Sequence, residues 1–292
     1  MAKARDIKRR IKSIKSTQQI TKTMEMVSAS KLKKAQKRLV EARPYHRSLR
    51  EMTVELLKGL GGQGTHPLMK AYPNVESAII LLITSNRGLC GAFNNNLIRL
   101  CERTIGDYRR RGVQTRLFIS GKKGIAYFRY INHPVEGAYT EYSDLPTVEG
   151  LQPLADLFME EYTGGRAQEV QIVSSSFRSV MTQAPLLYRL LPIAAPEGGG
   201  IEIRDEDRYI IEPSTGSILV DLLPAYIRNS VYQLFLETHT SEHGARRTAM
   251  KAASENADDM IKTLTRRYNR ARQSQITQEL AEIVGGAEAL RG

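Results

Sequence analysis

The sequence has 292 residues, of which 41% are hydrophobic and 25% charged, which is enough for one or two domains with a real core. No apolar stretch approaches the roughly 18 residues that a membrane-spanning helix needs, and the basic start lacks the apolar segment of a signal peptide. The two cysteines, Cys90 and Cys101, argue against an oxidised, disulfide-linked scaffold. We therefore expect the chain to stay in the compartment where it is made.

The net charge of +12 is concentrated at one end of the chain. Residues 1–58 hold 17 Lys and Arg against 5 Asp and Glu, so this segment carries the whole excess. A basic segment favours an anionic partner, and the candidates are a nucleic acid, a lipid surface or an acidic protein. Charge alone does not choose among them.

Residues 1–60 are predicted to form one long helix. A ladder with alternating steps of four and three runs through it, as heptads require. The ladder consists of Ile7, Ile11, Ile14, Gln18, Thr21, Glu25, Ser28, Leu32, Ala35, Leu39, Ala42, His46, Leu49, Thr53 and Leu56. A second apolar stripe at Ile20, Met24 and Val27 indicates that the helix is contacted on more than one side. Pro44 predicts a bend or a break.

Residues 74–210 are predicted to form a central α/β domain. Apolar strands at 75–84, 115–120, 169–177 and 184–193, and a short strand at 135–139, alternate with helices at 91–112, 121–131 and 147–165. Alternation of this kind is typical of a doubly wound, mostly parallel sheet. Such a domain can be Rossmann-like in topology without binding a nucleotide.

Residues 215–292 are predicted to form a second long helix, with a stripe that begins at Ile227, Val231 and Leu234 and continues through alanines. Neither terminal helix can bury its stripe on the central domain alone, so we expect the two to pair as an antiparallel coiled coil. Since the C-terminal helix is the longer, the N-terminal residues should lie near its middle. The fold class is therefore α/β, with two long terminal helices and a central Rossmann-like domain.

The turns that could hold phosphate do not match phosphate-binding patterns. Residues 84–94 and 120–124 both lead from a strand into a helix, but neither fits GxGxxG or GxxxxGK[ST]. His239 and His243 have a spacing that can hold zinc, but no third ligand is evident. No acid–base or nucleophilic set stands out, so we predict no catalytic, cofactor or metal residues.

Four segments resemble the gamma subunit of rotary ATP synthases. TQQITKTMEMVSASKLKKAQ at 17–36 is similar to the family's N-terminal helix, and TSNRGLCGAFN at 84–94 to its first strand-to-helix loop. SEHGARRTAMKAASENA at 241–257 resembles its C-terminal helix. ITQELAEIVGGAEA at 276–289 meets the signature IT-x-E-x-x-E-x-x-x-GA at each defined position.

The resemblance implies a rotor shaft that turns inside a ring of alpha and beta subunits and does no chemistry itself. Contacts to the beta subunits are expected at Lys8, Arg9, Met24, Lys31, Arg246, Gln273 and Thr277, with Arg246 and Gln273 as a hydrogen-bonding catch. The far end would be an apolar bearing made of Leu280, Ile283, Val284 and Leu290. Ile211 and Glu212 match the foot that meets the membrane c-ring and the epsilon subunit.

The resemblance also implies a bacterial protein, bound peripherally to the cytoplasmic face of the plasma membrane through its complex. Two other functions remain open at this point. A basic coiled-coil protein that binds nucleic acid would explain the charge, but not the apolar C-terminal end. A Rossmann-type enzyme would explain the central domain, and a thermal shift with a nucleotide would favour it.

Overall fold

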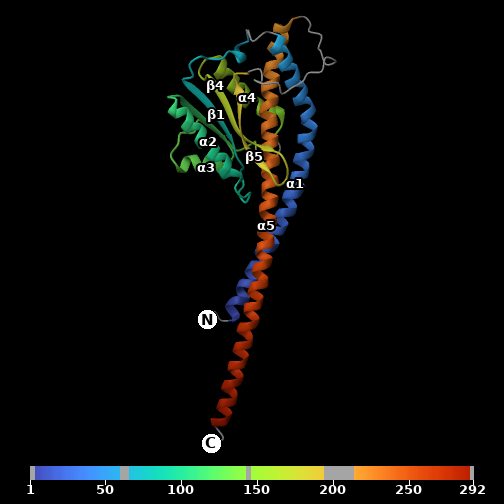
Figure 1. Ribbon diagram of the computed structural model, residues 1–292, viewed down its shortest axis with the longest axis vertical. Helices are drawn as coiled ribbons and strands as arrows, with labels where there is room; N and C mark the ends of the chain where they lie inside the picture. Colours follow the sequence, from blue (N-terminus) through green and yellow to red (C-terminus); the bar gives the residue numbers. More distant parts are fainter. Residues whose placement is uncertain (1–3, 60–65, 143–145, 194–213, 290–292) are drawn as a thin grey trace. The chain divides into compact units, whose positions relative to one another are not determined.

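The computed structural model describes the chain except residues 1–3, 60–65, 143–145, 194–213 and 290–292 (Figure 1). Contacts divide it into two units, Ala29–Arg246 and the paired chain ends Met1–Ser28 with Arg247–Gly292. The elements in chain order are α1 (Ala4–Gly59), a short 3-10 helix (Pro67–Met69), β1 (Ser77–Ile83), α2 (Phe93–Arg110), β2 (Gln114–Ser120), α3 (Lys122–Tyr130), β3 (Gly137–Tyr139), α4 (Val148–Thr163), β4 (Glu169–Phe177), β5 (Gln183–Leu191) and α5 (Thr215–Ala289).

The unit Ala29–Arg246 is built on a five-stranded sheet with the strand order β3-β2-β1-β4-β5. The first four strands are parallel, and β5 pairs antiparallel with β4. Parallel neighbours need long crossover connections, which α2, α3 and α4 supply. Every residue of β1 from Ala78 to Ile83 is buried, because helices cover both faces of the sheet.

Successive residues of β1 enter two separate cores. Ala78, Ile80 and Leu82 pack with α2 and α3, whereas Ile79, Leu81 and Ile83 pack with α4, α5 and the end of α1. This alternation follows from the period of two in a strand. The predicted fold class, with two long terminal helices and a doubly wound, Rossmann-like sheet, is thereby confirmed.

Helix α1 uses its ladder as a buried face. In the unit Ala29–Arg246, the ladder residues Leu32 and Leu39 are both 2% exposed, whereas Val40 and Tyr45 between ladder positions are about 60% exposed. The helix is assigned without interruption through Pro44, so the break that this proline suggested is absent.

In the unit of paired chain ends, the N-terminal part of α1 runs antiparallel to α5. The side-chain amide of Gln18 donates to Asp258 Oδ1 at 3.3 Å, which fixes the register. Ladder residues face the partner helix: Ile7 and Ser28 are buried, and those between them are partly covered. Two residues of the second stripe point outward, Ile20 at 60% and Val27 at 53% exposed, whereas Met24 is partly covered.

Helix α5 extends beyond the start of α1 (Figure 1). Its stripe stays partly covered as far as Ala271, and every residue from 272 to 287 is exposed. Counting outward from the Gln18–Asp258 pair puts Ala4 opposite about residue 272, because both helices rise equally per residue. Ala4, the first residue of α1, therefore lies partway along α5, as predicted, but well past the middle of α5.

Candidate functional site

The place where doubly wound sheets usually bind ligands lies between β1 and β4, beyond their carboxyl ends, where the winding reverses. The loop that follows β1, residues 84–92, lies there. Its side chains accept hydrogen bonds from backbone amides at the start of α3. Asn86 Oδ1 accepts from the Lys122 amide at 2.8 Å, and Thr84 Oγ1 accepts from the Gly124 amide at 3.0 Å. The Lys123 amide donates to the Ser85 carbonyl at 3.1 Å. The three amides that open α3 are thus bound by protein groups.

Helix α5 brings a buried polar cluster to the same end of the sheet. The cluster consists of Thr238, His239, Glu242, His243 and Arg246, all under 10% exposed. The Ser175 amide of β4 donates to Thr238 Oγ1 at 3.1 Å. His239 Nε2 lies 2.8 Å from the Tyr142 carbonyl. These contacts fasten α5 to the edge where a nucleotide-binding relative of this topology would hold its ligand.

Glu242 and Arg246 form the charged centre of this polar cluster. Arg246 Nη2 donates to Glu242 Oε1 at 2.7 Å, and each side chain is less than a tenth exposed. Burial alone would raise the pKa of Glu242, but the hydrogen bond with His239 and the charge of Arg246 outweigh it and hold the pKa below its ordinary value. Glu242 is therefore ionised at neutral pH.

His243 is held neutral in the same cluster. Burial lowers its pKa to about 4, and Arg246 and Lys31 act in the same direction, against Glu242. His239 and His243 were weighed as zinc ligands from their spacing. Within the described ranges, no three of His, Cys, Asp and Glu come together in a way that could hold a metal ion.

The predicted contact residues at the chain ends lie on the surface, with two of them partly covered. Lys8 and Arg9 are exposed, and Arg9 also pairs with Asp6 at 3.3 Å. Met24 and Lys31 are half-buried. Met26 is not among the predicted contact residues, although it is 58% exposed and lies beside Ile20 and Val27. It falls outside the regular stripe spacing, so periodicity did not indicate it.

Arg246 differs from the other predicted contact residues because it points inward. Its Nε donates to the Gly88 carbonyl at 3.2 Å and its Nη2 to the Arg87 carbonyl at 3.0 Å. Its Nη1 lies 3.4 Å from His243 Nδ1. Gln273, the other half of the expected catch, is exposed on the unpaired part of α5. Arg246 and Gln273 belong to different units, and the contact of each with another subunit stays a prediction.

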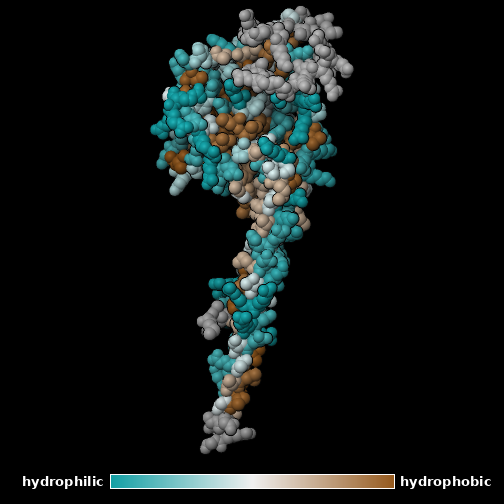
Figure 2. Space-filling model, viewed as in Figure 1, coloured by the Kyte–Doolittle hydropathy of each residue, from teal (hydrophilic) through white to brown (hydrophobic). Residues whose placement is uncertain are grey.

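The far end of α5 carries apolar side chains on one face (Figure 2). Leu280, Ile283 and Val284 are 57%, 67% and 65% exposed. Ile276, which is 43% exposed, extends the same face because residues four apart on a helix are neighbours. Thr277 is exposed, and its hydroxyl donates to the Gln273 carbonyl at 3.0 Å. Leu290 of the predicted bearing, and Ile211 and Glu212 of the predicted foot, lie outside the described residues.

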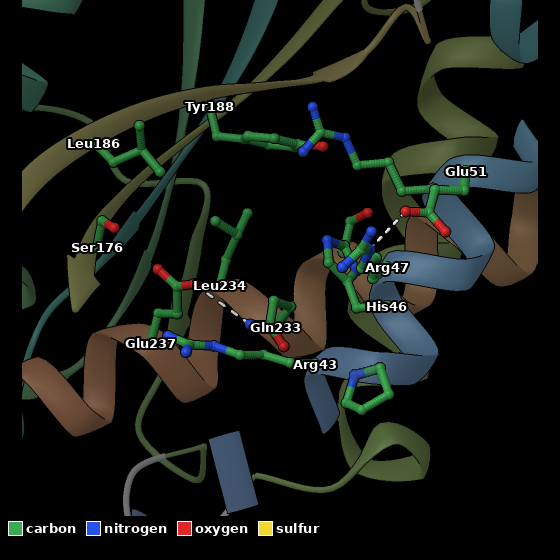
Figure 3. A pocket seen from close by; sticks show the side chains of 13 residues that line it. Arg43, His46, Arg47, Glu51, Ser176, Leu186, Tyr188, Gln233, Leu234 and Glu237 are labelled. Atoms are coloured by element: carbon green, nitrogen blue, oxygen red, sulfur yellow. Dashed lines mark hydrogen bonds and ion pairs between the residues drawn. The ribbon is translucent and has the colours of Figure 1, made fainter. Parts of the chain in front are cut away.

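A cavity of about 840 Å³ opens between α1, β5 and α5 (Figure 3). Cationic and anionic side chains line it together, and Arg47 Nε donates to Glu51 Oε1 at 2.6 Å. His46 Nδ1 lies 2.8 Å from Asn229 Oδ1, and burial lowers its pKa. Because carboxylates alternate with guanidinium groups, the cavity has no single-sign field of the kind that selects a phosphate.

Comparison with known proteins gives a match over nearly the whole length. The family model described as ATP synthase covers residues 3–290. The chain belongs to the ATP synthase gamma chain family. The gamma chain of Gemmatimonas aurantiaca is 39% identical, and the match covers 100% of both chains. That of Moorella thermoacetica is 43% identical, again over 100% of both. The nucleic-acid alternative finds no support among these relatives.

Chains of solved mitochondrial ATP synthase structures have the same fold. A chain in the Euglena gracilis rotor, rotational state 1, has a TM-score of 0.65 at 18% identity, with 94% of this chain and 98% of that chain covered. Another, from the OSCP/F1/c-ring structure in rotational state 3, has a TM-score of 0.69 at 20% identity and covers 98% and 94%. At these identities the likeness supports the fold alone. Along its described segments, the gamma chain has no helix that is both long and apolar enough to cross a membrane.

Proposed function

We propose that this gamma chain is the central rotor shaft of a proton-translocating ATP synthase. Rotation of the membrane c-ring turns the shaft inside the ring of alpha and beta subunits, and the turning shaft drives their catalytic sites through successive conformations. Hydrolysis of ATP turns it in the opposite direction. The observation that carries the proposal is the full-length match to bacterial gamma chains at about 40% identity.

The paired chain ends have the features that a shaft needs. Their helices are joined by half-buried ladder contacts, and α5 continues as a single exposed helix beyond the start of α1. The apolar face at its end, Leu280 to Val284, suits a bearing because apolar contact is non-directional and permits sliding. We assign Leu290 to the same bearing from the sequence match.

The basic and polar residues of the shaft are the proposed contacts with the beta subunits. Lys8, Arg9 and Lys31 offer charges to acidic loops, and an exposed ion pair is worth only about 0–1 kcal/mol. Contacts of that strength bias an angle without fixing it. Met24, Arg246, Gln273 and Thr277 complete the set. Ile211 and Glu212 are the proposed foot for the c-ring and the epsilon subunit.

The chain itself is proposed to be non-catalytic, as one part of an enzyme complex on the cytoplasmic face of the bacterial plasma membrane. The bound amides at the start of α3 and the polar cluster of α5 at the switch point support this proposal. The amides are donors that a nucleotide phosphate could otherwise use, and the cluster lies where a nucleotide would otherwise bind.

Reconstitution with alpha and beta subunits tests the rotor function. We expect a stable complex in which ATP drives rotation of a probe attached to the sheet-containing unit Ala29–Arg246 of this chain, called the α/β body below. A chain that failed to join the ring, or one that joined it without any rotation of the probe, would contradict the proposal.

A further inference from the structure

Arg246 is the last residue of α5 in the unit that contains the sheet. Upstream of it, α5 is held by apolar contacts, since Leu223, Ile227 and Phe235 are each 0% exposed in the core beneath the sheet. Asn229, Ser230 and Gln233 are buried among these apolar residues, and from Thr238 to Arg246 every buried side chain is polar or charged. The contacts that hold α5 are therefore mainly hydrogen bonds in its last two turns within the unit Ala29–Arg246.

Hydrogen bonds restrain rotation about a helix axis in a way that apolar packing does not. Apolar contacts are non-directional and tolerate small sliding movements, whereas a hydrogen bond weakens steeply when its angle changes. A guanidinium that donates from two nitrogens to adjacent carbonyls has a fixed fork geometry. Arg246 does this toward Arg87 and Gly88, at 3.0 and 3.2 Å.

The loop that accepts these bonds is itself firmly tied to the sheet. The Ser85 hydroxyl donates to the Arg87 carbonyl at 2.6 Å, and the Ser85 amide donates to Asn94 Oδ1 at 3.0 Å. Asn86 bonds the Thr140 carbonyl at 2.8 Å on the far side of the loop. A force applied to Arg246 is thus passed to β1, α2 and the segment after β3, not absorbed by a free loop.

The other side of α5 is equally constrained. Gly244 lies so close to the β4–β5 connection that a Cβ there would meet Gln183 Nε2 at 3.3 Å and Phe177 Cε2 at 3.5 Å. On the helix itself, Glu242 lies one turn before Arg246 and pairs with it at 2.7 Å, which fixes the guanidinium in place. The helix is therefore held between the loop on one side and the hairpin on the other.

We propose that Arg246, braced by Glu242, is a positioning residue that locks α5 against rotation relative to the loop after β1, so that torque passes between the α/β body and the shaft without slip. This inference rests on the proposed rotor function. It gives Arg246 a role inside the chain in addition to the contact with a beta subunit that the family resemblance implies and that stays a prediction. All three guanidinium nitrogens already have partners within the unit.

Hydrogen exchange on the assembled complex tests the lock itself. In Arg246→Gln, the amides of residues 85–92 should exchange at least about tenfold faster, because hydrogen bonds to a charged group have been lost. Arg246→Lys keeps the charge without the fork and should give an intermediate rate. Arg247→Ala, which removes the neighbouring arginine, should leave these amides as in wild type. Equal exchange in all four proteins would overturn the inference.

Angular fluctuations of the rotor test its mechanical role. With the shaft held in the alpha and beta ring, a probe on the α/β body should fluctuate over a wider angle in Arg246→Gln than in wild type or Arg247→Ala. Glu242→Gln should widen the distribution as well. Faster exchange with an unchanged angular width would overturn the torque role and leave the rotor function intact. A wild-type complex without rotation would instead contradict the rotor function, whatever the exchange rates.

Discussion

Removing the apolar face at the end of α5 should weaken assembly without weakening the fold. Leu280, Ile283 and Val284 keep 57–67% of their surface exposed. Full burial of such a side chain contributes about 1.5–3 kcal/mol, so roughly 1–2 kcal/mol per residue is still available for a partner. Replacing all three by serine should therefore cost about 3–5 kcal/mol of binding, a factor of roughly 10² to 4 × 10³ in affinity.

The assay compares the affinity of the chain for the alpha and beta ring with its own thermal unfolding. The triple serine variant should unfold at nearly the wild-type temperature, since its side chains contact little in the chain. Leu32→Ala is the matched control, because Leu32 is 2% exposed and its loss should destabilise the fold by about 2–5 kcal/mol. If the triple variant bound the ring like wild type, the bearing would be wrongly placed.

Three further predictions concern the buried cluster, the helix register and catalysis. Folding lowers the pKa of His243 from 6.5 to about 4, so between these two pH values the unfolded chain takes up a proton that the folded chain does not. Acidification from pH 6.5 to 4 should therefore remove up to about 3 kcal/mol of folding stability. In His243→Gln, the free energy of unfolding should depend less on pH over this range. Glu242, Arg246, His239 and Lys31 surround this group. Gln18→Cys with Asp258→Cys should form a disulfide on oxidation, whereas Gln18→Cys with a cysteine at Gln278 should not. The purified chain should hydrolyse no ATP, and turnover that a point substitution abolished would refute its non-catalytic assignment.

The helices and strands could be predicted from the sequence because their signals are local and periodic. Every ladder position of α1, from Ile7 to Leu56, is buried or partly covered, whichever unit it belongs to. The strand 77–83 is almost continuously apolar because helices cover both faces of the sheet. The strand order and the antiparallel β5 depend on long-range packing, which leaves no comparable signal in a short window.

The orientation of single side chains on α5 could not be predicted in the same way. A resemblance places Arg246 at a motif position but does not say which way its guanidinium points. The run from Thr238 to His243 did contain a hint, since six consecutive polar residues interrupt the apolar stripe of a helix that must remain packed. Such a stretch can lie buried only if other parts of the chain supply hydrogen-bond partners. The loop after β1, β4 and the Tyr142 carbonyl supply them.

The position of α5 at the point where the winding of the sheet reverses links the fold to the proposed function. A doubly wound sheet offers a crevice beyond its carboxyl ends, and an enzyme leaves that crevice open for a ligand. Here Thr238 bonds β4 and Arg246 bonds the loop after β1, so α5 spans the two strands between which the winding reverses. A helix fixed at that point is joined to both halves of the sheet, and a torque on either half therefore reaches the same helix. The topology that serves ligand binding in other proteins thus gives α5 two points of attachment at the crevice, which supports its proposed use as the mount of a shaft.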